Sequence, residues 1–377
     1  MNARHLNLLR TLLSQPTAPF HEAAIVLQAR RWAEGRGVSF ARDSSGNVLL
    51  RYRKGRAAPV RWVFSAHMDH PGFVARRQRG EQLWADFLGS VRREYFAGSR
   101  VRFFAPRGEV VARIVGVRKP ANSPWLACRL KLGQAAEVPA GSIGMWDLPA
   151  VRIRGKRLAG RACDDVAGTA AVLCAMDEIA SRRLSADVTG LLTRAEEAAF
   201  IGAMAACETG SIPQDAMIVA METSAAQPAA RLGDGVVVRV GDRVRTYDPS
   251  LTGHVSAVAE SLRKRDRRFR YARQLMPGGT CESTAYAMWG YVATGLCLPL
   301  GNYHNQGKAG RIAAEQIHLD DFASLVKLLV ALAVDRRRPG DADAMLRGQL
   351  QRLLRTRRKF LWPRPKRGHA ADRRGGS

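Results

Sequence analysis

Apolar positions in the first and last parts of the chain switch between strand spacing and helix spacing. Residues 60–66 form a mainly apolar run, which is typical of a strand buried on both faces. We predict helices over residues 5–14, 22–35, 166–181, 198–207, 249–263 and 320–334, and core strands over residues 38–41, 48–52, 60–66, 188–192, 216–221 and 291–298. This alternation predicts an α/β fold in which a mixed sheet is flanked by helices.

The middle of the chain has a different pattern. Between Gly72 and Gly160, short strand-like segments are separated by Gly and Pro turns, without helical spacing. We predict strands at residues 73–77, 82–87, 100–104, 110–117, 125–132 and 150–153. Short, evenly spaced strands indicate a small barrel or sandwich. We therefore divide the chain into an α/β host at 1–72 and 160–340, an inserted β domain at 73–159, and a C-terminal tail at 341–377.

Chain length and composition indicate the general class of this protein. The chain has 377 residues, 46% of them hydrophobic, which predicts a globular protein of two domains. The apolar run at 325–334 is too short to span a membrane, and residues 1–15 lack the apolar core of a signal peptide. Six cysteines without a C-x-x-C pair fit reduced thiols, although Cys163 and Cys281 lie near candidate site motifs. We expect a cytoplasmic protein without a membrane partner.

The chain is strongly basic, with 60 Lys+Arg against 33 Asp+Glu and a formal net charge of +27. Basic residues concentrate at 263–273 and again from residue 341 onward, where 11 Lys+Arg face 3 Asp. We interpret the tail as a solvated, partly disordered segment; contact with nucleic acid or another polyanion is the alternative. No zinc finger, aromatic RNA-binding strand or basic zipper accompanies it.

Acidic and histidine motifs follow several of the predicted strands. His67 ends the strand at 60–66, Glu196-Glu197 follow the strand at 188–192, Glu222 follows 216–221, and His304 lies in the loop after 291–298. Because ligand sites in open α/β sheets lie outside the carboxyl ends of the strands, we expect these side chains to meet. Asp69, two residues after His67 on an extended backbone, is placed to accept the spare ring N–H of His67.

Each motif also has an ordinary structural interpretation. Asp164-Asp165 precedes a helix and fits an N-cap, and Glu196-Glu197 fits the start of another helix. Adjacent carboxylates repel, however, and a divalent cation would keep both ionised. Together the motifs predict two metal ions, each held by one His and one carboxylate, with a shared Asp between them. The ligand set suits Zn²⁺, with Co²⁺ or Mn²⁺ as substitutes.

Four segments, at residues 66–73, 161–168, 194–197 and 276–280, resemble the glutamyl/deblocking aminopeptidases, a family of dinuclear zinc metallopeptidases that includes the tetrahedral aminopeptidases. The resemblance implies a zinc-peptidase-type α/β domain interrupted by a small β-barrel, and assembly into a homo-oligomer. It also implies the following roles: His67 and Glu222 on one metal, Glu197 and His304 on the other, Asp164 as the bridge, Glu196 as general base and acid, and Asp69 as partner of His67.

The chain departs from the family pattern at several positions. Glu222 stands where the family usually has Asp, and Cys281 stands where it commonly has Asp after Gly-Gly-Thr, which bears on substrate positioning. The loop from His304 to Glu315 is long, and the basic tail is additional. We expect an aminopeptidase that cleaves N-terminal residues from peptides through a metal-bridging water activated by Glu196. The alternatives are a metal-dependent deacylase of N-acyl amino acids and a degenerate peptidase fold that binds polyanions.

Overall fold

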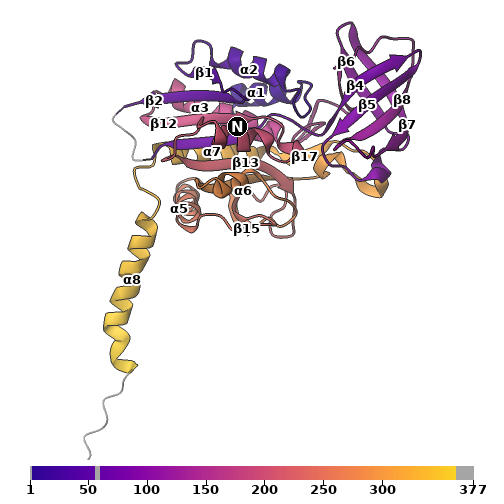
Figure 1. Cartoon of the computed structure of the whole chain (residues 1–377). Coiled ribbons are helices and arrows are strands. Elements are labelled where there is room, and N and C mark those ends of the chain that lie inside the picture. Colours follow the sequence, from indigo (N-terminus) through magenta and orange to yellow (C-terminus); the bar gives the residue numbers. More distant parts are fainter. Residues whose placement is uncertain (1, 56–59, 362–377) are drawn as a thin grey trace, which may run out of the picture.

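The computed structural model describes residues 2–55 and 60–361, and its largest element is an eight-stranded mixed sheet (Figure 1). In sheet order the strands are β1 (Ser39–Arg42), β2 (Val48–Lys54), β12 (Ala186–Thr193), β3 (Trp62–His67), β13 (Met217–Ala225), β16 (Val292–Leu300), β14 (Val236–Gly241) and β15 (Tyr271–Leu275). The four central strands β12, β3, β13 and β16 are mutually parallel. All six residues of β3 are buried, as its apolar run predicts.

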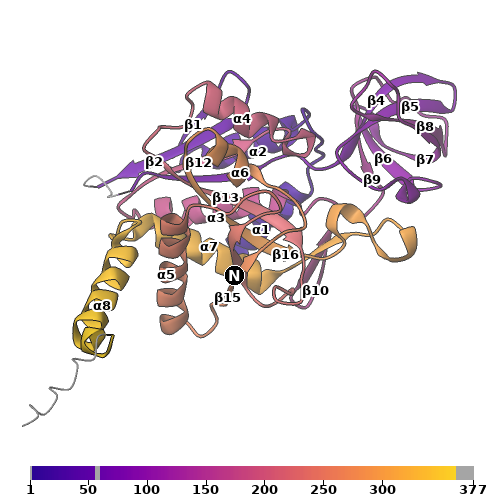
Figure 2. The ribbon, with the colours of Figure 1, turned by 60° about the horizontal axis from the view of Figure 1, so that its bottom comes forward.

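Helices cover both faces of this sheet (Figure 2). The larger apolar core packs one face against α1 (Ala3–Leu13), α2 (Ala23–Ala33), α3 (Val166–Ser181), α5 (Pro249–Arg265) and α7 (Leu319–Val334). A smaller core packs the other face against α4 (Ile201–Glu208) and α6 (Glu282–Met288). The predicted α/β class, with a mixed sheet flanked by helices, is confirmed.

A closed six-stranded barrel is inserted between β3 and α3 and lies to one side of the sheet (Figure 1). Its strands, in barrel order, are β4 (Gly72–Arg79), β5 (Gln82–Leu88), β8 (Leu126–Leu132), β7 (Gly108–Arg118), β6 (Arg100–Ala105) and β9 (Ile143–Trp146). Four fully buried rings, Phe73, Phe87, Phe96 and Trp146, fill its centre with centroids 4.9–6.3 Å apart. The insert is therefore a barrel and not a sandwich.

The strand predicted at residues 150–153 does not belong to the barrel. It is β10 (Val151–Arg154), which pairs with β11 (Arg157–Gly160), and β11 pairs in turn with β17 (Glu315–His318). The sequence pattern could not reveal this placement, because β17 comes from the far end of the chain. β9, which closes the barrel in its place, was not predicted. The register of β11 and β17 sets Gly160 opposite Glu315, which brings Glu315 close to Asp164.

Beyond α7 the chain forms α8 (Asp341–Arg357), a helix that the sequence analysis did not predict and that projects from the body (Figure 1). A short 3-10 helix, Arg358–Phe360, follows. Residues 362–377, the remainder of the predicted tail, lie outside the described residues. Over the part of the chain that the structure describes, every helix is too short or too polar to cross a bilayer.

Candidate metal centre

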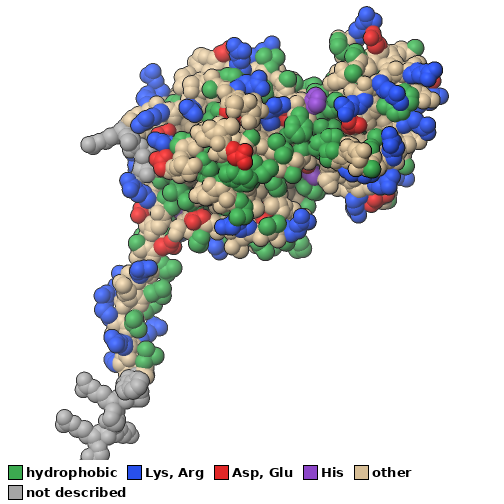
Figure 3. Space-filling view, in the orientation of Figure 1, with side chains coloured by type: hydrophobic (Ala, Val, Ile, Leu, Met, Phe, Trp, Pro, Cys, Tyr) green, Lys and Arg blue, Asp and Glu red, His purple; other side chains and the backbone are tan. Residues whose placement is uncertain are grey.

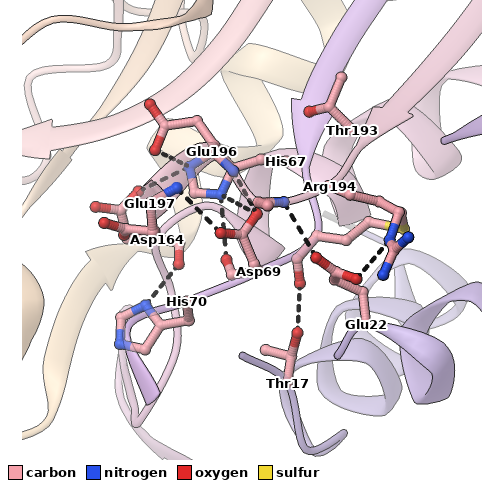
Figure 4. Close-up of polar contacts among 12 residues, drawn as sticks. Thr17, Glu22, His67, Asp69, His70, Asp164, Thr193, Arg194, Glu196 and Glu197 are labelled. Carbon is pink, nitrogen blue, oxygen red and sulfur yellow. Dashed lines mark hydrogen bonds and ion pairs between the residues drawn. The ribbon is translucent and has the colours of Figure 1, made fainter. Parts of the chain in front are cut away.

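Four parallel strands carry the predicted ligands to one edge of the sheet. His67 is the last residue of β3, Glu196 and Glu197 form a 3-10 turn after β12, and His304 lies in a similar turn after β16. Glu222 was predicted to follow its strand, but it lies inside β13 and reaches the same place from there. Asp164, which precedes α3, completes the group (Figure 4). The structure thus brings all the predicted site residues together.

His67 is the centre of the first of two ligand clusters. Its Nε2 lies 3.6 Å from Asp164 Oδ1 and 3.8 Å from both Glu196 Oε2 and Glu222 Oε1. The side chain is 1% exposed, so these groups meet away from bulk water. An imidazole nitrogen facing carboxylate oxygens at these distances leaves room for a cation between them.

His304 is the centre of the second cluster. Its Nε2 lies 3.1 Å from Glu197 Oε1 and 3.5 Å from Asp164 Oδ2. The two oxygens of Asp164 therefore face different histidines, one in each cluster. A carboxylate shared in this way is the feature that a dinuclear centre requires.

The chemistry of these side chains fits a pair of divalent cations. Asp164 Oδ1, Glu197 Oε1 and both carboxylate oxygens of Asp165 are buried without a hydrogen-bond partner among the described residues. Asp164, Asp165 and Glu222 also have oxygens within 4.8 Å of one another. Buried carboxylates at this density need positive charge nearby. Imidazole nitrogen and carboxylate oxygen are ligands that zinc accepts.

The pKa values of the clustered groups show the same need for positive charge. Burial, together with the neighbouring Asp164 carboxylate, raises the pKa of Glu222 to about 7. Burial alone would lower the pKa of His67, but Glu196, Asp164, Asp69 and Glu222 raise it well above its ordinary value. Both shifts favour protonation, so metal binding at this site would compete with protons.

Asp69 supports the ligands in a way that the sequence did not predict. Its carboxylate accepts the backbone N–H groups of Glu196 and Glu197, both at 3.0 Å. The Nδ1 atom of His67 lies 3.1 Å from the Asp69 carbonyl oxygen and 3.6 Å from its carboxylate. Asp69 therefore orients side chains of both clusters: it fixes the His67 ring through its backbone and the Glu196-Glu197 turn through its side chain (Figure 4).

The turn that carries Glu196 is held in an unusual backbone conformation. Ala195, immediately before it, has a φ of 52°, in the left-handed region that non-glycine residues rarely adopt. Buried Glu22 accepts the Ala195 N–H at 3.1 Å and pairs with Arg194 Nε at 2.7 Å (Figure 4). The sequence analysis missed Glu22, whose only signal is an acid at the start of a helix. Strained backbone of this kind persists where surrounding contacts hold it.

Glu315 is a second buried carboxylate that the sequence analysis did not assign. One of its oxygens accepts the N–H groups of Cys163 at 2.7 Å and Asp164 at 3.0 Å, and the other accepts the N–H of His304 at 2.8 Å. It is fully buried. Glu315 therefore holds the backbone of the shared ligand and of the second histidine in one frame. His70 adds to this frame by donating from Nδ1 to the Asp164 carbonyl at 2.7 Å.

The inserted barrel also reaches the second cluster. His304 Nδ1 lies 2.7 Å from the carbonyl oxygen of Ser90, in the loop after β5, and this donation leaves Nε2 free to face the carboxylates. Two contacts attach the loop after His304 to the segment that follows β5. The Arg92 backbone N–H donates to Gln306 Oε1 at 3.2 Å, and the Tyr95 hydroxyl donates to the Gly307 carbonyl at 2.8 Å. The long loop after His304 thus connects the inserted barrel to the second cluster.

A small pocket of about 60 Å³ opens beside Glu222. It is lined by Glu222–Ala225, Gln227, Arg239, Met276, Gly278–Thr280 and Tyr303. Arg239 is 1% exposed; its Nη1 donates to Ser224 Oγ at 3.4 Å, and its Nε has no partner among the described residues. Burial opposes its charge, but Cys281, Tyr247, Cys297 and Glu222 raise the pKa of Arg239 above its ordinary value. The wall of the pocket therefore includes a buried cation whose Nε has no hydrogen-bond partner among the described residues.

Comparison with known proteins gives one family and one fold. Residues 130–328, more than half of the chain, match the sequence profile of the M42 glutamyl aminopeptidase family. No functionally curated protein matches.

Among solved structures, the chain is similar to a TET1 peptidase of Pyrococcus horikoshii (20% identity, 88% of this chain and 99% of that one, TM-score 0.71). It is also similar to an aminopeptidase of Desulfurococcus kamchatkensis (19%, 88% and 95%, 0.71) and to an endoglucanase of Thermotoga maritima (19%, 86% and 96%, 0.65). At these identities the likeness establishes a shared fold.

Proposed function

Because the chain belongs to the M42 glutamyl aminopeptidase family and is a peptide hydrolase, we propose that it is a dinuclear metal-dependent aminopeptidase that removes N-terminal residues from peptides. The observation that carries this proposal is the position of Asp164, whose two oxygens face His67 at 3.6 Å and His304 at 3.5 Å. One carboxylate between two histidine–carboxylate clusters is the arrangement of a two-metal hydrolase.

The family implies divalent metal ions, and the residues present suit them. In our assignment His67 and Glu222 hold one ion, Glu197 and His304 hold the other, and Asp164 is shared. Zn²⁺ is the metal that this ligand set fits best, with Co²⁺ or Mn²⁺ as substitutes. Two such ions, when bound, would lower the pKa of a bound water molecule and polarise the scissile carbonyl.

Glu196 is the proposed general base. Its Oε2 lies beside His67 Nε2, at 3.8 Å, and burial raises the pKa of this carboxyl well above its ordinary value. In the proposed mechanism Glu196 takes a proton from the attacking water and delivers it to the departing amine. The Asp69 carboxylate, bonded to the Glu196 N–H, keeps this group in position.

The role of Glu196 is separable from metal binding by one substitution. Glu196→Gln removes the base but keeps the shape of the side chain, so we expect two metals per chain and a loss of about 10²–10⁴ in kcat. Metal content is measured by elemental analysis on the protein used for the assay. Retained turnover would refute the assignment, and loss of a metal would make Glu196 a ligand.

The pocket beside Glu222 supports a preference for an acidic N-terminal side chain. Arg239 offers a buried guanidinium at its wall, and a carboxylate is the group that a guanidinium binds best. A panel of Glu, Asp, Leu and Ala aminoacyl amides tests this preference. N-acetylated amino acids in the same panel test the deacylase alternative, because a deacylase would cleave the blocked compounds and leave the free amides intact.

We also propose that the chain assembles into a homo-oligomer. Two of the similar solved structures are described as a dodecamer and as a peptidase that forms a tetrahedron or a large octahedral shell. The chain shares their barrel-plus-sheet fold over 88% or more of its length. Mass photometry of the purified chain measures the assembly, and a monomer at micromolar concentration would contradict it.

A further inference from the structure

The C-terminal helix α8 (Asp341–Arg357) is an exposed element that, among the described residues, contacts the body through its first turn. None of its residues is buried, and beyond its first turn it extends away from the body (Figures 1 and 2). Ser250 of α5 donates to the carboxylate of Asp343, which ties that first turn to the body. An isolated helix of 17 residues is marginally stable in water. The rest of α8 therefore needs a contact that the body does not provide.

Apolar side chains form a stripe along α8. Leu346, Leu350, Leu353 and Leu354 follow helical i, i+4, i+7, i+8 spacing, so they share one face. They are 45–56% exposed, and Phe360 and Leu361, which follow the helix, are each 73% exposed. Large apolar side chains exposed in a row mark an interaction surface.

The other faces of α8 are basic. Between residues 341 and 361 the sequence has six Lys or Arg and two Asp, a net charge of +4, and both Asp lie in the first turn near the body. Arg347 lies beside the leucine stripe, whereas Arg352 and Arg355 lie on the opposite face of the helix. Figure 3 shows blue and green side chains next to each other along this helix. The free part of α8 therefore combines an apolar face with basic side chains beside and opposite it.

These features argue against a second copy of the chain as the partner. A coiled-coil seam through Leu346, Leu350 and Leu353 would be interrupted by Asp343 at its N-terminal end and by Arg357 at its C-terminal end. It is therefore shorter than the three or four heptads that such pairing needs. Two α8 helices would also repel each other, since each is cationic. A nucleic acid would use the arginines but leave the leucine stripe exposed.

We propose that α8 binds the surface of a bilayer rich in anionic phospholipids. A helix with an apolar stripe and Lys or Arg beside it lies in the plane of the interface, with the apolar side chains at the acyl boundary and the cations among the headgroups. In this arrangement Leu350 and Leu353 face the lipid, and Arg347, beside the stripe, and Arg357, at its C-terminal end, contact phosphate. α8 is too short and too polar to cross the membrane, so the contact is peripheral.

The test is flotation of the full-length protein with vesicles of phosphatidylglycerol mixed with phosphatidylcholine, and with vesicles of phosphatidylcholine alone. We expect binding to the anionic vesicles that falls with added salt, and little binding to the neutral ones. Leu350→Asp should weaken this binding more than about tenfold. Gln351→Asp is the matched control: it adds the same charge at the next residue, off the stripe, and should weaken binding several-fold less.

Three results would overturn the proposal: no binding to anionic vesicles, equal weakening by both variants, or no effect of Leu350→Asp. Tighter binding to single-stranded RNA than to the vesicles, insensitive to Leu350→Asp, would assign α8 to nucleic acid. Self-association in mass photometry that is lost on truncation after Gly340 would assign it to a second copy. The melting temperature of Leu350→Asp should equal that of the wild type, because Leu350 is not part of the core.

Discussion

Glu315→Gln is the substitution that tests most closely how the metal centre is held in place. The native carboxylate accepts three backbone N–H groups, those of Cys163, Asp164 and His304, at 2.7–3.0 Å. A glutamine has one acceptor oxygen and one NH₂ group in their place. At least one of the three N–H groups is then left facing a donor, in a site without exposure to water.

The magnitude follows from the bond that is lost. A hydrogen bond to a charged group contributes ~1.5–3 kcal/mol, and a buried donor left unpaired costs a similar amount. These N–H groups belong to Cys163, Asp164 and His304. Losing one of the bonds would therefore displace the side chains proposed to bind metal. We therefore expect at least one metal to bind about 10- to 100-fold more weakly, while the overall fold is retained.

Competition with a chromophoric chelator measures both metal affinities, and circular dichroism reports the fold. Glu94→Gln is the control, since it makes the same change at an exposed carboxylate whose ion pair, among the described residues, is with Arg92. The reasoning is refuted if Glu315→Gln binds both metals within twofold of the wild type. It is also refuted if the control weakens binding as much.

Four further outcomes are expected. Arg239→Gln should reduce the ratio of kcat/KM for Glu-amide to kcat/KM for Leu-amide by about tenfold or more. Arg245→Gln, at an exposed position, is the control and should leave this ratio unchanged. The ratio does not depend on the fraction of the protein that is folded. Phe96→Ala should cost ~3–5 kcal/mol in the free energy of unfolding measured in urea, because it removes a fully buried ring at the centre of the barrel. Removing metal with a chelator should lower the melting temperature, since ions that bind only the folded chain stabilise it, and an unchanged value would argue against a preformed site. Burial lowers the pKa of His254, so folding favours the neutral form of this side chain. The stability that neutral His254 contributes is present above the unfolded pKa of ~6.5 and is lost as pH falls through the folded pKa. His254→Gln should therefore flatten the acid-side decline of the melting temperature.

The sequence predicted the elements whose pattern is local. The apolar run of β3, the alternation after α3 and the Gly/Pro turns of the insert carry enough information to predict the sheet, its helices and the barrel. His67, Asp164, Glu197, Glu222 and His304 were also accessible, because their positions near the carboxyl ends of strands follow from the same pattern.

Contacts between distant parts of the chain were not accessible. Glu315 acts on Asp164 across 151 residues, through the pairing of β11 with β17, and nothing near Glu315 in the sequence indicates that contact. The bond from His304 to Ser90 depends likewise on where the barrel sits. Asp69 was found as a residue of the site, but the direction of its side chain, toward the Glu196-Glu197 turn, depends on the fold.

The C-terminal segment shows how a charge count can obscure a pattern. Eleven Lys or Arg after residue 341 suggested a solvated tail, and the short apolar runs of the chain suggested no membrane partner. The leucines at helical spacing within the tail are visible once α8 is present. The proposed membrane contact departs from that expectation and rests on the exposed stripe.

The central claim is that two metal ions, sharing Asp164, perform the hydrolysis. Its most direct test is the rate of aminoacyl-amide hydrolysis as Zn²⁺ is added back to metal-free protein, with bound metal counted at each point. We predict that full activity requires two ions per chain and that Asp164→Asn, which weakens the shared ligand, stays inactive at the same metal concentration. Full turnover by the metal-free chain, or by a chain holding a single ion, would contradict the claim.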